Sequence, residues 1–139
     1  MLKHSQHSQR YWMLGVLLAW LTLVACQPSL QVSAASDHEA LPSPGFLVRD
    51  PSKPGQRPRY DTVQLLAANG QVLWHLRSEP FGDTNSVGEL TYGKSPGGFT
   101  TIVAPSPLAP QGHYTLAISG IGYGTFRFRV DSAGRIQKE

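Results

Sequence analysis

The sequence TVQLLAANGQVLWHLR, residues 62–77, decides the fold. Residues 62–68 and 71–77 are rich in the aliphatic, aromatic and β-branched residues that favour strands. Asn69-Gly70 between them is the pair that accepts positive φ at both centres of a type I′ turn. The stretch therefore predicts an antiparallel hairpin closed by a two-residue turn.

The spacing of apolar residues predicts which side chains face a core. Alternate residues of a strand point to opposite sides of the sheet, so apolar residues at every second position mark the buried side. In the second strand of this hairpin the residues expected inside are Val72, Trp74 and Leu76, and those expected outside are Leu73, His75 and Arg77. A final hairpin, over 113–119 and 125–130, shows the same pattern. Its inward residues are Phe126, Phe128 and Val130, and its outward residues are Arg127 and Arg129.

Further short strands are expected over residues 46–48, 89–92, 99–103 and 135–137. Glycine (14) and proline (11) are abundant and charged residues make up only 15%, which favours turns and extended segments over surface helices. The sequence therefore predicts an all-β domain over residues 42–139, built as a small two-sheet sandwich of six or seven strands.

The stretch LAPQGHY, residues 108–114, comes directly before an alternating strand. It resembles the tyrosine corner of immunoglobulin-like and fibronectin type III domains, in which the tyrosine hydroxyl bonds upstream backbone as its strand begins. The resemblance implies an immunoglobulin-like sandwich, with Tyr114 as the corner residue and Trp74 on an early central strand. A longer run is similar to uncharacterised bacterial envelope proteins and implies no known activity; its matching residues are Tyr92, Gly93, Pro96, Gly98, Phe99, Pro107, Leu108, Gly112 and Tyr114.

The N-terminus has the form of a secretory signal. Residues 1–11 are polar and carry Lys3 and Arg10, and residues 12–25 are almost entirely apolar. A helix of this apolar length spans about 21 Å, against roughly 30 Å for the hydrocarbon core of a bilayer. We therefore expect residues 1–25 to be a signal helix that is removed, and not a stable transmembrane segment.

The apolar run ends in LVAC, residues 23–26, which resembles the lipobox of bacterial lipoproteins. In that family, Leu23, Val24 and Ala25 are what the signal peptidase recognises before it cuts. The resemblance implies a diacylglyceryl group on the thiol of Cys26, cleavage before that residue, and acylation of the new amine, for example with palmitate. The alternatives are an ordinary signal peptide with an incidental cysteine, or an uncleaved signal anchor.

Residues 26–41 are expected to form a flexible tether with a reach of roughly 20 Å. Gln27 stands where an aspartate resembles an inner-membrane retention signal. The expected location is therefore the outer membrane, with the domain facing the periplasm and membrane lipid as the partner of acylated Cys26.

Charge and residue types exclude several function classes. Without Lys3 and Arg10, ten lysines and arginines face nine acidic residues, so no basic footprint for nucleic acid is present. Cys26 is the only cysteine, and of five histidines only His75 and His113 fall within the expected domain. No metal site, cofactor or catalytic residue is expected.

Three pairs of residues are candidates for contacts with an unknown envelope protein or polysaccharide, and the first pair is also a candidate for contacts with anionic lipid headgroups. They lie in the basic stretch after the first strand, in the long loop 79–98, and on the outer face of the final hairpin; they are Arg57 and Arg59, Phe81 and Tyr92, and Arg127 and Arg129. The alternatives are a solvated loop, aromatic rings that belong to the core, and solvated sheet charges. The chain is thus expected to be a lipid-anchored, non-catalytic binding or accessory module of the envelope. The competing class is an envelope hydrolase whose active site the sequence does not reveal.

Overall fold

The computed structural model describes residues 29–82 and 87–139, which form nine strands and no helix. The strands are β1 Gln31–Ala34, β2 Gly45–Arg49, β3 Thr62–Ala67, β4 Val72–Ser78, β5 Glu89–Thr91, β6 Phe99–Val103, β7 His113–Ser119, β8 Tyr123–Val130 and β9 Ile136–Lys138. The prediction of an all-β chain is confirmed for this part of the sequence. The expected signal helix lies outside the described residues.

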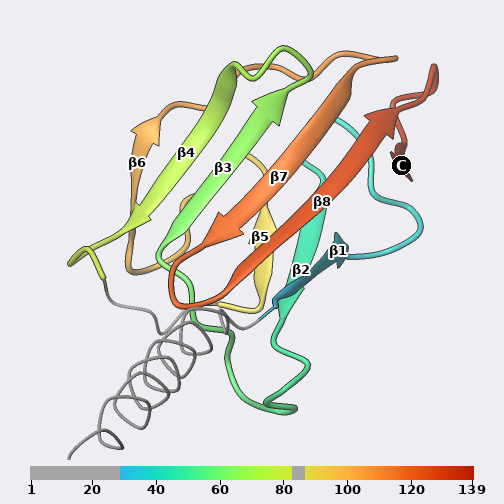
Figure 1. Ribbon diagram of the computed structural model, residues 1–139. Coiled ribbons are helices and arrows are strands. Elements are labelled where there is room, and N and C mark those ends of the chain that lie inside the picture. Colours follow the sequence, from blue (N-terminus) through green and yellow to red (C-terminus); the bar gives the residue numbers. More distant parts are fainter. Residues whose placement is uncertain (1–28, 83–86) are drawn as a thin grey trace, which may run out of the picture.

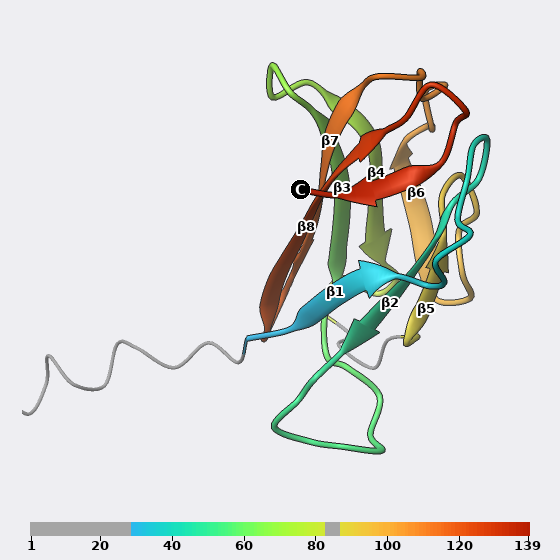
Figure 2. The same ribbon diagram turned by 90° about the vertical axis from the view of Figure 1, so that its right-hand side faces the viewer.

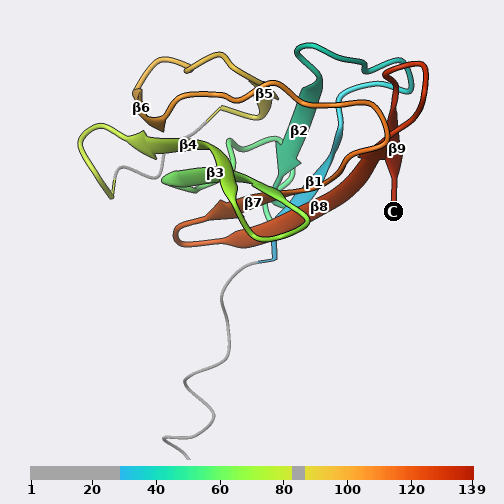
Figure 3. The same cartoon turned by 90° about the horizontal axis from the view of Figure 1, so that it is seen from above.

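The strands form two antiparallel sheets (Figure 1). The small sheet has the order β1-β2-β5 and the large sheet the order β6-β4-β3-β7-β8-β9. Figure 2 shows β1, β2 and β5 facing the large sheet, and Figure 3 shows β6 and β9 at opposite sides of the molecule. The predicted two sheets are confirmed, but the number of strands is nine and not six or seven.

The hairpin of β3 and β4 is confirmed, but its turn is not the predicted type I′ turn. Only Gly70 of the Asn69-Gly70 pair has a positive φ, of 86°. The Gly70 N–H donates to the Ala67 carbonyl at 2.9 Å, and the Gln71 N–H donates to the Asn69 side chain at 2.9 Å. The loop therefore contains three residues, with the glycine in the left-handed position that follows a type I turn.

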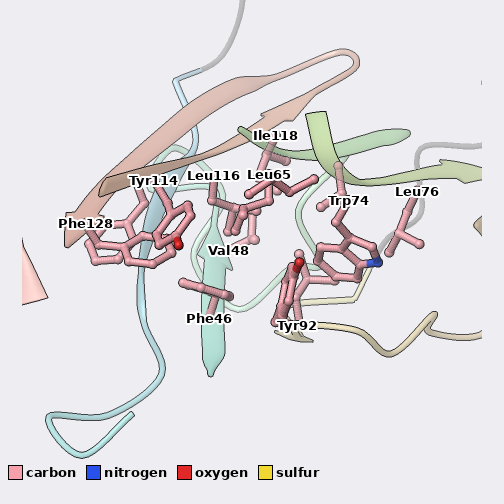
Figure 4. Packing of buried hydrophobic residues seen from close by; sticks show 14 of the residues in the cluster. Phe46, Val48, Leu65, Trp74, Leu76, Tyr92, Tyr114, Leu116, Ile118 and Phe128 are labelled. Atoms are coloured by element: carbon pink, nitrogen blue, oxygen red, sulfur yellow. The ribbon is translucent and has the colours of Figure 1, made fainter. Parts of the chain in front are cut away.

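The core lies between the two sheets and contains several fully buried large side chains. Phe46, Trp74 and Phe128 each have 0% exposure, and Figure 4 shows them gathered with their neighbours. Leu73 was expected outside but is only 8% exposed. Because Leu65 pairs with Trp74 and Leu66 with Val72, Leu73 is the extra residue of a bulge, which changes the alternation of β4.

Tyr114 makes the hydrogen bond that the tyrosine-corner motif predicts. The Ala109 N–H, five residues upstream, donates to the Tyr114 hydroxyl oxygen at 2.9 Å. The ring lies directly over Gly112, where an added Cβ would come within 2.3 Å of that oxygen. Glycine is therefore required at this position for the tyrosine to reach back along the chain.

Replacing Tyr114 with phenylalanine should lower the free energy of unfolding by about 1–3 kcal/mol, because the Ala109 N–H loses its acceptor. The same replacement at Tyr123, which is 50% exposed, is the control and should have little effect. Chemical denaturation of both purified variants measures the difference. Equal stability of the two variants would contradict a stabilising role for the corner.

The prediction of a flexible tether over residues 26–41 is wrong for the part that the structure describes. Leu30 is 5% exposed, and its N–H donates to the Tyr123 carbonyl at 2.8 Å. The following residues form β1, which pairs with β2 through all four of its positions. Leu41 continues the contact, since its N–H donates to the Gly134 carbonyl at 2.8 Å. The folded domain therefore includes the chain from Ser29 onwards.

Candidate functional site

The chain enters the sandwich at one end, which we call the N-terminal pole. It comprises residues 29–30, the β2–β3 loop (50–61), the β7–β8 turn (120–122) and the described parts of the β4–β5 connection (79–82 and 87–88). The β2–β3 loop is the lowest part of the domain in Figure 2, and the β7–β8 turn lies at the same end. The β3–β4 and β8–β9 turns lie at the opposite end.

Backbone contacts connect the segments of the N-terminal pole. The Gly122 N–H donates to the Arg59 carbonyl at 3.3 Å, which joins the β7–β8 turn to the end of the β2–β3 loop. At Gly120 an added Cβ would lie 2.8 Å from the Asp61 nitrogen, so only glycine permits this approach. The Tyr60 hydroxyl donates to the Val87 carbonyl at 2.6 Å, and burial raises the pKa of Tyr60. The pole is thus tied together at three places.

Two large apolar side chains are exposed where the β7–β8 hairpin reaches this pole, Ile121 by 44% and Tyr123 by 50%. They lie at the tip of the β7–β8 hairpin, on either side of Gly122. Sequence reasoning treated this segment only as a glycine-rich turn and did not select either residue. Ile121 could have been noticed in the sequence, because it is a large aliphatic residue between two glycines at a hairpin tip. A side chain at such a tip is not expected to reach the core.

The β2–β3 loop places its basic residues in solvent. Its only acidic residue before Asp61, Asp50, accepts hydrogen bonds from the Ser52 hydroxyl at 2.6 Å and from the Ser52 N–H at 2.9 Å. The hydroxyl hydrogen bond, more than the backbone one, lowers the pKa of Asp50, which stays ionised and holds the turn. Lys53, Arg57 and Arg59 are exposed. The structure therefore places the predicted pair Arg57 and Arg59 on the N-terminal pole.

A hollow of about 690 Å³ lies between this loop and the outer face of the small sheet. Leu47 of β2 contributes to its floor, and Arg49, Lys53 and Arg57 line it together with Glu89 of β5. Asp50 also lines the hollow, so three cations face two carboxylates and the net charge of the lining is +1.

Phe81 and Tyr92, predicted together as partner-binding aromatics, differ in exposure. Phe81 is 65% exposed, and the Arg77 guanidinium carbon lies 5.0 Å from its ring centre. Tyr92 is 3% exposed, packs edge-on against Trp74, and donates its hydroxyl to the Ser106 carbonyl (Figure 4). Burial raises the pKa of Tyr92 to about 12. The prediction for Tyr92 as a contact residue is wrong, since the ring belongs to the core.

Arg127 and Arg129 lie exposed on the outer face of β8, as predicted. In the neighbouring strand β7, Thr115 pairs with Arg127 and His113 pairs with Arg129. We call these four residues the β8 strip. The Nδ1 atom of His113 lies 2.5 Å from a carboxylate oxygen of Glu139, which contributes a negative charge at that end.

His75, which was expected to be exposed, is half-buried, and its Nε2 atom has no hydrogen-bond partner. Burial, with a smaller contribution from the charge of Arg77, lowers the pKa of His75. Among residues 29–82 and 87–139, no three histidine, cysteine, aspartate or glutamate side chains gather as a metal site would require.

Comparisons with protein-family models, with curated proteins and with solved structures found no match. None of the described segments forms a helix long and apolar enough to cross a membrane. The candidate lipobox, Leu23, Val24, Ala25 and Cys26, lies outside the described residues.

Proposed function

We propose that this chain is a lipid-anchored protein of the bacterial envelope, and that its domain is a non-catalytic module that binds an anionic envelope polysaccharide. The observation that carries the proposal is the polarity of the domain. The chain enters at the N-terminal pole, whereas Arg129 lies six residues along β8 from Tyr123, a rise of roughly 20 Å. A domain anchored at that pole presents the β8 strip away from the membrane.

Anchorage at Cys26 follows from thiol chemistry. The thiolate is the side-chain group most readily alkylated to a stable thioether, and Cys26 is the only cysteine of the chain. One acyl chain holds a protein only marginally, but two or three chains hold it for practical purposes permanently. The lipobox resemblance and Gln27 support an outer-membrane location that faces the periplasm.

We propose further that the sandwich is immunoglobulin-like. The order β1-β2-β5 fits the A, B and E strands of such domains, and β4-β3-β7-β8 fits the C′, C, F and G strands. Tyr114 at the start of β7 then occupies the F-strand position of a tyrosine corner. Strands β6 and β9 are additions, and Trp74 lies on the strand that corresponds to C′ and not on C.

The β8 strip supports the choice of ligand. Guanidinium groups form strong charge-assisted hydrogen bonds with carboxylates and phosphates, and the threonine hydroxyl both donates to and accepts from sugar hydroxyls. Beside the strip lies a hollow of about 310 Å³, lined by Thr115, Arg127, His113 and Glu139 together with Ala67, Ala68 and Tyr114. These groups match a sugar polymer that carries acidic substituents.

Changing Arg127 and Arg129 to glutamate should weaken binding of the lipidated protein to peptidoglycan, an acidic envelope polysaccharide, roughly tenfold. Co-sedimentation with purified sacculi in detergent measures this. The control is Lys53→Glu with Arg57→Glu, which makes the same charge change at the N-terminal pole. Binding that falls equally in both variants, or in neither, would contradict the β8 strip as the binding surface.

A further inference from the structure

We propose that the N-terminal pole lies directly against the membrane, with Ile121 and Tyr123 in the interfacial region and the β2–β3 loop on anionic lipid headgroups. This inference rests on the proposed lipid anchorage and adds an orientation to it. The domain would then rest with this pole on the membrane surface, an arrangement that we call seated. It would not move freely on a tether.

The covalent distance from the anchor to the domain is short. Ser29 pairs with Tyr123 as an isolated bridge, and Leu30 is held by its hydrogen bond to the same residue. Only two residues, Gln27 and Pro28, separate Cys26 from Ser29, and the three residue steps between them span at most about 11 Å when extended. The segment 29–41, expected to act as a spacer, is folded into the sandwich. The lipid chains therefore hold the N-terminal pole close to the headgroups.

The close packing of Leu30 fixes which part of the domain is nearest to the anchor. An added Cβ at Gly122 would lie 2.8 Å from a carbon of the Leu30 side chain, and one at Gly124 would lie 2.5 Å from the Leu30 carbonyl. Glycine at both positions lets the incoming chain lie flat on the β7–β8 hairpin. The tip of that hairpin is thus the protein surface beside Leu30.

The exposed side chains at this tip suit a membrane interface. Tyrosine is enriched where an apolar ring meets headgroups and its hydroxyl stays hydrated, and an aliphatic side chain gains from leaving water. Ile121 and Tyr123 are two of the four large apolar residues that are exposed among the described residues, and Phe81 at the same pole is a third. This gathering at one end is unlike the scattered exposure that is ordinary on protein surfaces.

The basic residues of the β2–β3 loop suit anionic lipid. Lys53 and Arg57 are exposed on this loop, and Asp50 beside them is engaged with Ser52. The other acidic residues among the described positions of the pole are Asp61, at the end of the loop, and Glu79, in the β4–β5 connection. A basic side chain near an anionic surface gains about a factor of five in binding, provided that it lies within a Debye length of roughly 8 Å. The two-residue connection between Cys26 and Ser29 places the loop within reach of that layer.

The orientation can be measured on the lipidated protein as it exists. Acylation occupies the only natural thiol, so a cysteine introduced at Gln56 on the pole, or at Ser132 in the β8–β9 turn, carries a single fluorophore. The labelled proteins are reconstituted into phosphatidylglycerol-containing vesicles with a headgroup quencher. We expect strong quenching at position 56 and almost none at position 132.

Matched variants distinguish a pole that contacts the membrane from a pole that is only held near the membrane by the anchor. Lys53→Glu with Arg57→Glu should lower the ratio of seated to unseated domains by at least about thirtyfold, the effect of losing the two positive charges alone, and quenching at position 56 should fall accordingly. Arg127→Glu with Arg129→Glu, which makes the same charge change on the β8 strip, should leave quenching at position 56 unchanged. Ile121→Gln should also lower quenching, whereas Ile102→Gln should not, although Ile102 is 47% exposed.

Vesicle flotation, read on the same samples, distinguishes the two proposals. Protein that does not float with the vesicles would contradict the lipid anchor and the seated pole together. Protein that floats but is quenched equally at positions 56 and 132 would overturn the seated pole alone. Quenching at position 56 that both charge variants leave unchanged would overturn the role of the basic loop and, with it, the proposal.

Discussion

Replacing Cys26 with serine should abolish labelling of the protein by an alkyne palmitate analogue and release it from the membrane fraction. A serine hydroxyl is far less acidic and less nucleophilic than a thiol, so no thioether can form at this position. Without two or three acyl chains, the domain has no group whose burial makes attachment effectively irreversible. The expected change is therefore a complete loss and not a graded one.

The control for this experiment is Gln27→Ser, which changes the next residue but leaves the lipobox intact. That variant should keep its label and stay with the membranes. Retention of the Cys26→Ser protein in membranes at the wild-type level would contradict lipid anchorage. It would favour the uncleaved signal anchor that the apolar run of residues 12–25 left open.

Replacing Trp74 with alanine should lower the free energy of unfolding by about 3–5 kcal/mol, a large part of the roughly 5–15 kcal/mol that stabilises a domain of this size. The indole is fully buried, and its ring centre lies 5.2 Å from that of Tyr92 in an edge-on arrangement. Truncation removes this contact and leaves a cavity between the two sheets (Figure 4).

Phe81→Ala is the matched control, since it also removes an aromatic ring, but one that is 65% exposed. It should change stability by well under 1 kcal/mol. Chemical denaturation of both variants gives the two values. A Trp74→Ala protein as stable as the control would contradict a core centred on this side chain.

The two hairpins could be predicted from local sequence because both kinds of signal, alternation and turn residues, are complete within each hairpin. The β8 residues Phe126 and Phe128 are buried as expected, and Arg127 and Arg129 are exposed. The bulge at Leu73 could not be predicted, because an extra residue in one strand is defined only against the register of its partner.

The fold of residues 29–41 was missed for a different reason. Leu30, Val32 and Ala34 alternate with polar residues, but small side chains and serines made the segment look like a linker. The pairing of β1 with β2 and the contact with β8 provide the apolar surface that stabilises it. Such long-range pairing is not visible in the segment itself.

The exposure of the candidate contact residues was predicted correctly for the basic residues but not for both aromatic ones. Basic residues were correctly placed in solvent, because charges leave water only when they are paired. The aromatics Phe81 and Tyr92 could not be separated, since loop residues of the same type are buried or exposed according to what packs on them. Ile121 and Tyr123 could not be selected as contact residues from the sequence. Only the structure shows that they lie beside Leu30.

Mass spectrometry of the N-terminal peptide from the native membrane protein tests the central claim most directly. We expect a peptide that begins at Cys26 and carries the mass of a diacylglyceryl group on sulfur, with a further acyl chain on the amine where that step occurs. A peptide that still begins at Met1, or one with an unmodified thiol at Cys26, would contradict it.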